Sequence, residues 1–273
     1  MKLPFIDKLD SHMQEVVRGG AVAFVLKGLA AGVAFAFNVL LGRLLGAEGA
    51  GTYFLALTVA AIAIVFGSMG FDNVLLRFTA AGAAVGNWAM VKGVYQKGIT
   101  LSLLASAAAA GSMAILAPWL AEQVFSKSEL TSPIRWMSLG VIPMTQLILH
   151  AHLLKGLKRI RDSQLIEGLA IHTLALLGLY LLGQAWGVRG AVWAYTLSAL
   201  LTALLAYWIW HKATPQLQDT QGRFRTEDLL RTSFPLFLAA LLSLAMNWTS
   251  TFMLGMRLGT IIDGKLPKID HGT

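Results

Sequence analysis

The sequence predicts an all-α protein, a polytopic integral membrane bundle of about seven transmembrane helices with a cytoplasmic N-terminus. Apolar stretches long enough to cross a bilayer, about 20 residues each, divide the 273 residues almost from end to end. The composition agrees, since 56% of the residues are hydrophobic, 13% are charged and the mean hydropathy is +0.64. Soluble domains average about 25% charged residues, so lipid is the expected solvent of this chain.

The ends of the apolar runs are marked by glycine-rich turns, basic residues and tryptophans. Trp136, Trp186 and Trp210 lie at span ends, where tryptophan favours the headgroup region. Residues 78–97 are only weakly apolar, and we expect there a short interfacial helix that links the second span to the third. The predicted spans are, in order, residues 19–42, 53–76, 98–121, 136–154, 164–186, 188–210 and 232–254.

Basic residues predict the orientation of the bundle. When the loops are counted alternately, about twice as many of the 22 Lys and Arg residues lie on the side of the N-terminus as on the other side. Cytoplasmic loops collect positive charge, so the N-terminus is predicted inside and the end of the seventh span outside. The formal net charge of +8 has the same explanation and does not predict a nucleic-acid partner. The first apolar run is too long for a signal peptide, and we expect it to remain as an anchor.

No catalytic pattern is found in the sequence. The metalloprotease, P-loop and nucleophile-elbow motifs are missing, and the chain has no cysteine. We therefore predict no catalytic residue, no metal ligands and no cofactor, and a protein that is not an enzyme. His150 and His152 are two positions apart and face different sides of a helix, so helix-end polarity explains them better than a shared metal. His172 is interpreted as a packing residue.

Lys27 is the most informative polar residue, because a charge inside a span is costly and usually faces a cavity. It lies eight residues into the first predicted span, about 12 Å deep at ~1.5 Å per residue. On a helical wheel it shares a face with Gly20, Ala31, Ala34 and Asn38, a small and polar stripe suited to lining a hydrophilic cleft. The alternative is that the Lys27 side chain extends to the cytoplasmic headgroups.

Three acidic and basic groups are candidate partners for one another near the cytoplasmic side. Asp72 lies at a similar predicted depth in the second span, so we predict an ion pair between Lys27 and Asp72. Glu167 on the fifth span is a second candidate partner of Lys27. The alternative for Glu167 is an interfacial pair with Arg161 or Lys158.

Two segments of the chain resemble each other. The segment GAEGA at residues 46–50 precedes Tyr53, and the segment GVRGA at residues 187–191 precedes Tyr195. In both segments, glycine is predicted to end one helix and to allow a tight re-entry into the next. Chance similarity is the alternative explanation.

Several motifs resemble those of the bacterial polysaccharide exporters, the oligosaccharide flippases of O-antigen and teichoic-acid export. The segment GRLLGAEGAGTY at residues 42–53 is similar to the family's loop after the first helix, and GFDNVLLRF at residues 70–78 is similar to the end of its second helix. Residues 234–235 and the segment NWTSTFMLG at residues 247–255 resemble the start and end of its seventh helix. The resemblance covers roughly residues 14–255.

This resemblance implies a member of the multidrug/oligosaccharidyl-lipid/polysaccharide exporter superfamily, in which twelve to fourteen helices form two lobes around a central cavity. Alternating access would move a lipid-linked oligosaccharide, a polyprenyl pyrophosphate sugar, across the bacterial inner membrane. Cations of the first lobe would engage the anionic pyrophosphate. The candidate cavity residues are Lys27, Arg18, Arg43 and Arg77 from the resemblance, together with Asn38 and Asp72.

The resemblance also divides the chain. Residues 1–210 correspond to a six-helix N-terminal lobe, 211–231 to a cytoplasmic connector, and 232–255 to a seventh helix that begins a second lobe. Residues 256–273 form an atypical tail, and the rest of the second lobe is missing, as expected for a truncated or frameshifted product. Ser250 stands where family members tend to have aspartate, which argues against a site on the seventh helix.

Membrane lipids are expected partners, and self-association of two copies would replace the missing lobe. One alternative function is a cation-coupled multidrug exporter of the same superfamily that uses Asp72 for ion coupling. Another is a non-transporting membrane fragment or scaffold. A membrane-embedded sugar polymerase or ligase is disfavoured, because the longest predicted outer loop, residues 122–135, is too short to hold such a site.

Overall fold

The structure is a computed structural model that describes the backbone of residues 11–262 and the side chains of residues 20–244 and Met246. Within these residues all regular structure is helical, which confirms the predicted all-α fold. The long helices are α1 (Ser11–Ser68), α2 (Phe71–Ala84), α3 (Trp88–Trp119), α5 (Val141–Gly156), α8 (Gln184–Ala213) and α9 (Thr226–Ile262). The shorter segments are η2 (Leu120–Val124), η3 (Ser128–Leu130), α4 (Thr131–Met137), η4 (Ser138–Gly140), α6 (Ile160–Gln164), η5 (Leu165–Ala170), α7 (Ile171–Gly178), η6 (Leu179–Gly183) and η7 (Pro215–Leu217).

Two of the long helices contain a reversal of the chain at a glycine. Gly46 in α1 has φ 67° and ψ −176°, and Gly187 in α8 has φ 56° and ψ −131°, so neither residue is helical. A left-handed φ costs a residue with a Cβ roughly 1–2 kcal/mol, which explains why glycine occupies both positions. The prediction that a glycine separates neighbouring helices in segments 46–50 and 187–191 is confirmed.

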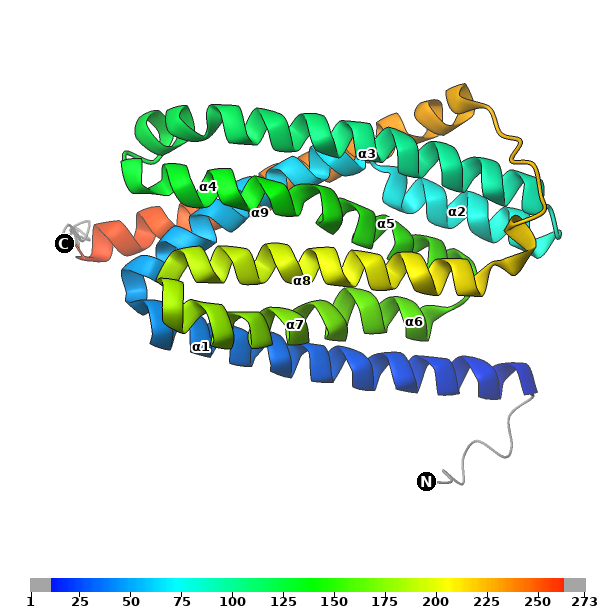
Figure 1. Cartoon of the computed structure of the whole chain (residues 1–273), viewed down its shortest axis with the longest axis horizontal. Helices are drawn as coiled ribbons and strands as arrows, with labels where there is room; N and C mark the ends of the chain where they lie inside the picture. Colours follow the sequence, from blue (N-terminus) through cyan, green and yellow to red (C-terminus); the bar gives the residue numbers. More distant parts are fainter. Residues whose placement is uncertain (1–10, 263–273) are drawn as a thin grey trace, which may run out of the picture.

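The helices form long legs that lie side by side (Figure 1). Four apolar stretches of the described residues are long enough to cross a bilayer, and the first and last of them, 49 and 54 residues long, each contain one glycine reversal and therefore two legs. With α9, these legs account for the seven predicted spans. The four stretches are Gly20–Ser68, Trp88–Val124, Ser128–Gly156 and Ile160–Ala213.

The two ends of the bundle carry different connections. Gly46 and Gly187 lie at one end, here called the reversal end, where α9 also finishes (Figure 1). Residues 214–225, between α8 and α9, lie at the opposite end, here called the connector end, where α1 begins (Figure 1). The first leg and α9 thus finish on the same side, as expected for an odd number of crossings.

The second leg is broken at Met69 and Gly70, which have φ values of 48° and 72°. A Cβ placed on Gly70 would lie 2.8 Å from the carbonyl oxygen of Ser233 and 2.7 Å from the amide nitrogen of Phe237. Such distances leave no room for a side chain. The break therefore brings the backbone of the second leg directly against α9.

The prediction of a short interfacial helix at residues 78–97 is wrong. Instead, α2 continues the second leg, and α3 begins after a turn of three residues. Gly86 supplies a φ of 69° in this turn, and the Asn87 side chain accepts a hydrogen bond of 3.1 Å from the amide of Met90. Because Asn87 caps α3, the two legs are joined without an intervening surface helix.

The buried side chains form two apolar clusters, one toward each end of the bundle. Tyr53 and Tyr195 belong to the cluster near the reversal end, and Phe71 and Trp210 belong to the cluster near the connector end. Trp210 is 0% exposed and stacks on Tyr95 with ring centroids 5.1 Å apart. Its predicted headgroup position is therefore wrong, because the ring faces α3 inside the bundle.

The connector is packed rather than loose. The amide of Arg223 donates a 2.9 Å hydrogen bond to the carbonyl of Ala89 on α3. The ring of Phe224 meets the ring of Phe78 on α2 edge to face, with centroids 5.0 Å apart. The connector therefore fixes the start of α9 against α2 and α3.

The reversal at Gly46 gives a testable difference between two glycines of the same leg. Neither Gly46 nor Gly42 would place a Cβ within 4 Å of another group, but only Gly46 has a positive φ. We expect Gly46→Ala to destabilise the protein by about 1 kcal/mol or more, measured by thermal unfolding in detergent. Gly42→Ala is the control, and because alanine is the better helix former by about 1 kcal/mol, it should leave the melting temperature unchanged or raise it. Equal destabilisation by both substitutions would contradict the reversal.

Candidate functional site

The predicted polar stripe of α1 lies on an exposed flank of the first leg. Lys27 and Asn38 are exposed, whereas Ala30, on the neighbouring flank, is buried against the η5 segment. The Asn38 side-chain amide donates a 2.9 Å hydrogen bond to the carbonyl of Ala34 in its own helix. Among the described residues, Lys27 forms no hydrogen bond or ion pair. Its ammonium group is therefore available to a ligand.

The predicted ion pair between Lys27 and Asp72 is wrong, because the described residues contain no such contact. The two legs of α1 diverge after Gly46, and α2 packs against α3 and α5 rather than beside the first leg (Figure 1). Asp72 instead occupies the first turn of α2. A carboxylate there is favoured by the helix dipole, which gives Asp72 a local structural role immediately after the break.

The other candidate cavity residues do not converge on one point. Arg43 is exposed close to the reversal end, and Arg77 is exposed on α2. Neither arginine forms an ion pair with a described residue. The side chain of Arg18 lies outside the described residues. The structure therefore spreads these cations along the bundle rather than gathering them around Lys27.

Glu167 forms an ion pair with Lys155, with 2.6 Å between Nζ and Oε2. The predicted partners Lys27, Arg161 and Lys158 are thus wrong for Glu167. It lies within η5, a π-helical turn that adds a residue to the regular helix. Such a turn shifts the facing of side chains, and wheel positions read from an ideal helix no longer apply.

A buried polar cluster between α3, α5 and α8 was missed by the sequence reasoning. His150 is 3% exposed, and its Nδ1–H donates a 2.7 Å hydrogen bond to the carbonyl of Gln146. With that proton on Nδ1, Nε2 accepts from the hydroxyl of Tyr95 at 3.4 Å. The amide of Gln146 donates to Ser102 at 3.1 Å. Helix-end polarity is therefore the wrong explanation for His150.

One signal in the sequence pointed to this cluster. Gln146 and His150 are four positions apart and so share a face of one helix.

Gln146 Oε1 is buried and has no partner among the described residues. The described residues contain no group of three His, Asp or Glu side chains able to hold a metal ion.

An apolar pocket of about 600 Å³ opens between the second leg of α1, α3 and α9. Phe66 and Phe237 form part of its wall, with ring centroids 5.7 Å apart, and Met113 closes its inner side. The lining is almost wholly hydrocarbon. It suits an alkyl or prenyl chain and not a sugar.

Comparisons with known proteins show which sequences and folds this chain resembles. Residues 16–265 match the family model described as polysaccharide biosynthesis protein. A comparison with curated protein sequences gives no match.

Among solved structures, the fold is similar to that of a MOP superfamily transporter from Pyrococcus furiosus, with 20% identity and a TM-score of 0.67 over 91% of this chain and 61% of that one. It is also similar to a MATE transporter in complex with MaD5, with 19% identity and a TM-score of 0.64 over 85% and 55% of the two chains. A third similar structure is an outward-facing multidrug resistance MATE transporter, with 20% identity and a TM-score of 0.60 over 89% and 60%. This chain thus spans less than two thirds of those transporters, and the similarity shows the fold alone.

The Lys155–Glu167 pair predicts the outcome of a charge exchange. Lys155→Glu alone places two carboxylates together, and Glu167→Lys alone places two ammonium groups together, so each should lower the melting temperature in detergent. The double exchange should recover most of the loss because the pair is restored with reversed sign. The same exchange at Arg225 and Glu227, a largely exposed pair at 2.7 Å, is the control and should change little. Additive losses in the Lys155 and Glu167 double variant would contradict the pair.

Proposed function

The chain belongs to the polysaccharide biosynthesis protein family, and from this we propose that it supplies the first lobe of a transporter for lipid-linked oligosaccharide. In this proposal residues 1–210 form the lobe, residues 211–231 connect it, and residues 232–255 begin the second lobe. The transported molecule is a polyprenyl pyrophosphate sugar, and the membrane is the bacterial inner membrane. The protein is a carrier and not an enzyme.

The observation that carries the proposal is Lys27, which lies on the exposed flank of α1 and forms no ion pair with any other described residue. An ammonium group within a membrane-crossing leg is costly unless it meets an anion or water. A pyrophosphate group that crosses the membrane is costly for the same reason, because it carries negative charge into the lipid. Contact between the two groups lowers both costs, since charge-assisted hydrogen bonds to phosphate are among the strongest in proteins.

The remaining groups of the first leg complement this role. Asn38 lies three turns further along the same flank as Lys27, about 16 Å away at ~1.5 Å per residue, and its amide oxygen remains free to accept from a sugar hydroxyl. Arg43, Arg77 and Arg18 would guide the anion toward and away from Lys27. The apolar pocket beside Phe237 supports the proposal, since it offers a surface for the prenyl chain outside the polar path.

The fold shared with multidrug transporters favours a second candidate function, cation-coupled drug export. In that alternative Asp72 carries the coupling ion. However, Asp72 lies in the first turn of α2, where a carboxylate stabilises the helix through its dipole. An acidic residue at this position therefore has a structural explanation that does not require ion coupling. A non-transporting scaffold is the third candidate, and it predicts no movement of either class of molecule.

A flipping assay with a purified transporter that contains this chain as its first lobe tests the proposal. Liposomes would contain a polyprenyl pyrophosphate sugar that carries a fluorophore bleached by an impermeant reductant, so that only the outer leaflet is bleached unless the lipid crosses. We expect bleaching to proceed to completion with the wild-type transporter. Lys27→Ala should slow the crossing about tenfold or more, because one charge-assisted contact contributes roughly 1.5–3 kcal/mol.

Two controls make the assay specific. Lys27→Arg keeps the charge and should retain most of the rate, and Lys127→Ala removes an exposed cation at the reversal end and should have no effect. An unchanged rate in Lys27→Ala would indicate that Lys27 only extends to the headgroups. Efflux of ethidium that depends on Asp72, without movement of the lipid-linked sugar, would favour drug export instead.

A further inference from the structure

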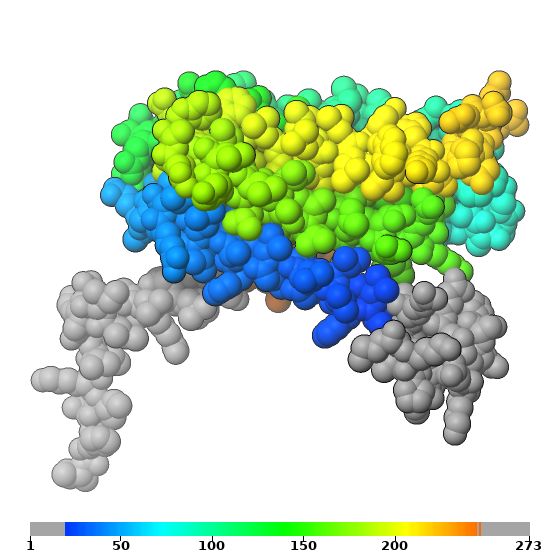
Figure 2. Space-filling view, turned by 60° about the horizontal axis from the view of Figure 1, so that its bottom comes forward, coloured from blue at the N-terminus to red at the C-terminus, as the bar shows by residue number. Residues whose placement is uncertain are grey.

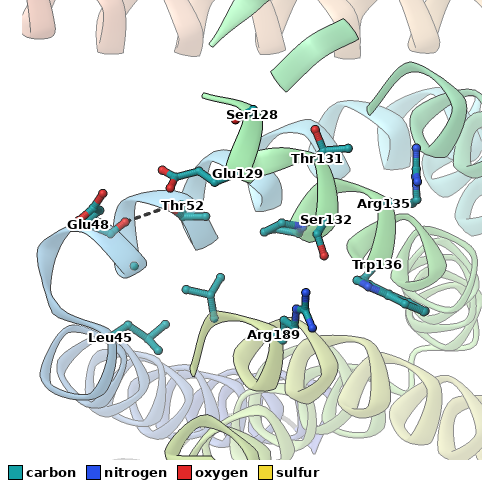
Figure 3. Close-up of a pocket in the computed structure, with 13 residues that line it drawn as sticks. Leu45, Glu48, Thr52, Ser128, Glu129, Thr131, Ser132, Arg135, Trp136 and Arg189 are labelled. Carbon is teal, nitrogen blue, oxygen red and sulfur yellow. Dashed lines mark hydrogen bonds between the residues drawn. The ribbon is translucent and has the colours of Figure 1, made fainter. Parts of the chain in front are cut away.

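A pocket of about 880 Å³ with a mixed-charge lining lies at the reversal end, away from Lys27 and the connector. Figure 3 shows its walls, which come from α1, η3, α4 and α8. The side chains with polar or aromatic groups that matter to its chemistry are Glu48, Glu129, Arg135, Arg189, Ser132 and Trp136.

The two glycine reversals build this pocket together. A Cβ on Gly49 would lie 3.3 Å from Cγ2 of Val188, so the segment after Gly46 packs directly on the segment after Gly187. In the two similar segments, GAEGA and GVRGA, Glu48 and Arg189 hold the same place, two residues after the reversing glycine. The same backbone turn therefore presents an anion from one segment and a cation from the other to one pocket.

The four charged groups of the pocket are separated by sign. Figure 3 shows Glu48 and Glu129 toward one end of the pocket and Arg189 and Trp136 toward the other, whereas Arg135 stands on a separate wall and points away from Arg189. Among the described residues, none of these four groups forms an ion pair, although ion pairs occur elsewhere in the bundle. A ligand with one positive and one negative group would satisfy both ends at once.

We propose that this pocket binds the headgroup of a zwitterionic phospholipid with a primary ammonium group, as in phosphatidylethanolamine. The phosphate would accept hydrogen bonds from the guanidinium group of Arg189, which suits the bidentate binding of phosphate oxygens, while Arg135 adds positive charge to the rim of the pocket. The ammonium would donate hydrogen bonds to the carboxylates of Glu48 and Glu129. This inference is independent of the proposed transport function.

The location of the pocket favours a lipid over a free sugar. The pocket lies at the reversal end, where the apolar legs of α1 and α8 turn, and the ends of membrane-crossing helices are where headgroups are expected. Trp136 is 43% exposed and rests against Trp193, with ring centroids 5.2 Å apart, which matches the preference of tryptophan for the interface. Leu45 and Val188 add an apolar edge for the glycerol and the first carbons of the acyl chains.

Lipid binding to the delipidated, detergent-purified chain tests the proposal. The probes are short-chain phosphatidylethanolamine, phosphatidylcholine and free phosphoethanolamine, with affinity taken from thermal stabilisation and from native mass spectrometry. Phosphatidylcholine has the same phosphate, but its trimethylammonium has no hydrogen to donate. We expect phosphatidylethanolamine to bind about tenfold more tightly than phosphatidylcholine, and free phosphoethanolamine to bind weakly because it lacks the chains.

The two ends of the pocket should respond differently to substitution. The double variant Glu48→Gln/Glu129→Gln should lose the preference for phosphatidylethanolamine while it still binds both lipids. The double variant Arg135→Gln/Arg189→Gln should bind both lipids about tenfold more weakly. Glu122→Gln/Lys127→Gln changes two exposed charges at the same end that do not line the pocket, and this control should behave as wild type.

Three results would overturn the proposal. One is equal affinity of the wild-type chain for phosphatidylethanolamine and phosphatidylcholine. Another is a parallel loss of both lipids in the two double variants, or a loss in the control. The third is stabilisation by a soluble oligosaccharide such as maltotriose and not by either lipid, which would identify the pocket as a sugar site.

Discussion

The structure depends on one constraint: in lipid, every backbone amide and carbonyl must find its partner within the chain. Long helices meet that demand, and any reversal must be short. Gly46 and Gly187 provide the tightest solution, because a left-handed φ at a single residue turns the chain while helical bonding resumes immediately on either side. The packing of these reversals on one another then creates the pocket at the reversal end.

Local features of the fold were predictable from the sequence because they depend on local causes. Apolar run length predicts the legs, and the paired glycine segments predict the reversals. The break at Met69 and Gly70 was not predictable in this way, since it is explained by the close approach of α9. The prediction of an interfacial helix at residues 78–97 was wrong because weak hydropathy does not distinguish a surface helix from the capped end of a membrane-crossing leg.

Side-chain partners were harder to predict because they depend on how the legs diverge and rotate. Depth alone suggested a pair between Lys27 and Asp72, but the legs of α1 separate before Asp72. Glu167 lies within the π-helical turn at residues 165–170 and pairs with Lys155, and no periodicity of the sequence reveals such a turn. The described bundle has chemically distinct surfaces at different levels: an exposed lysine, Lys27, on the first leg and a pocket with both acidic and basic side chains at the reversal end. Figure 2 shows α1 in front of the legs that follow it, with its flank open over much of its length.

We propose that both glycine reversals lie on the outer side of the membrane and the connector on the cytoplasmic side, as the distribution of Lys and Arg predicts. The chain has no cysteine, so single cysteines can be introduced without removing others. Ala47→Cys and Lys127→Cys would mark the reversal end, and Gln221→Cys would mark the connector end. In intact cells, a membrane-impermeant maleimide should label the first two and spare the third, which should react only after permeabilisation. Labelling of Gln221→Cys in intact cells, with protection of Ala47→Cys, would contradict the account.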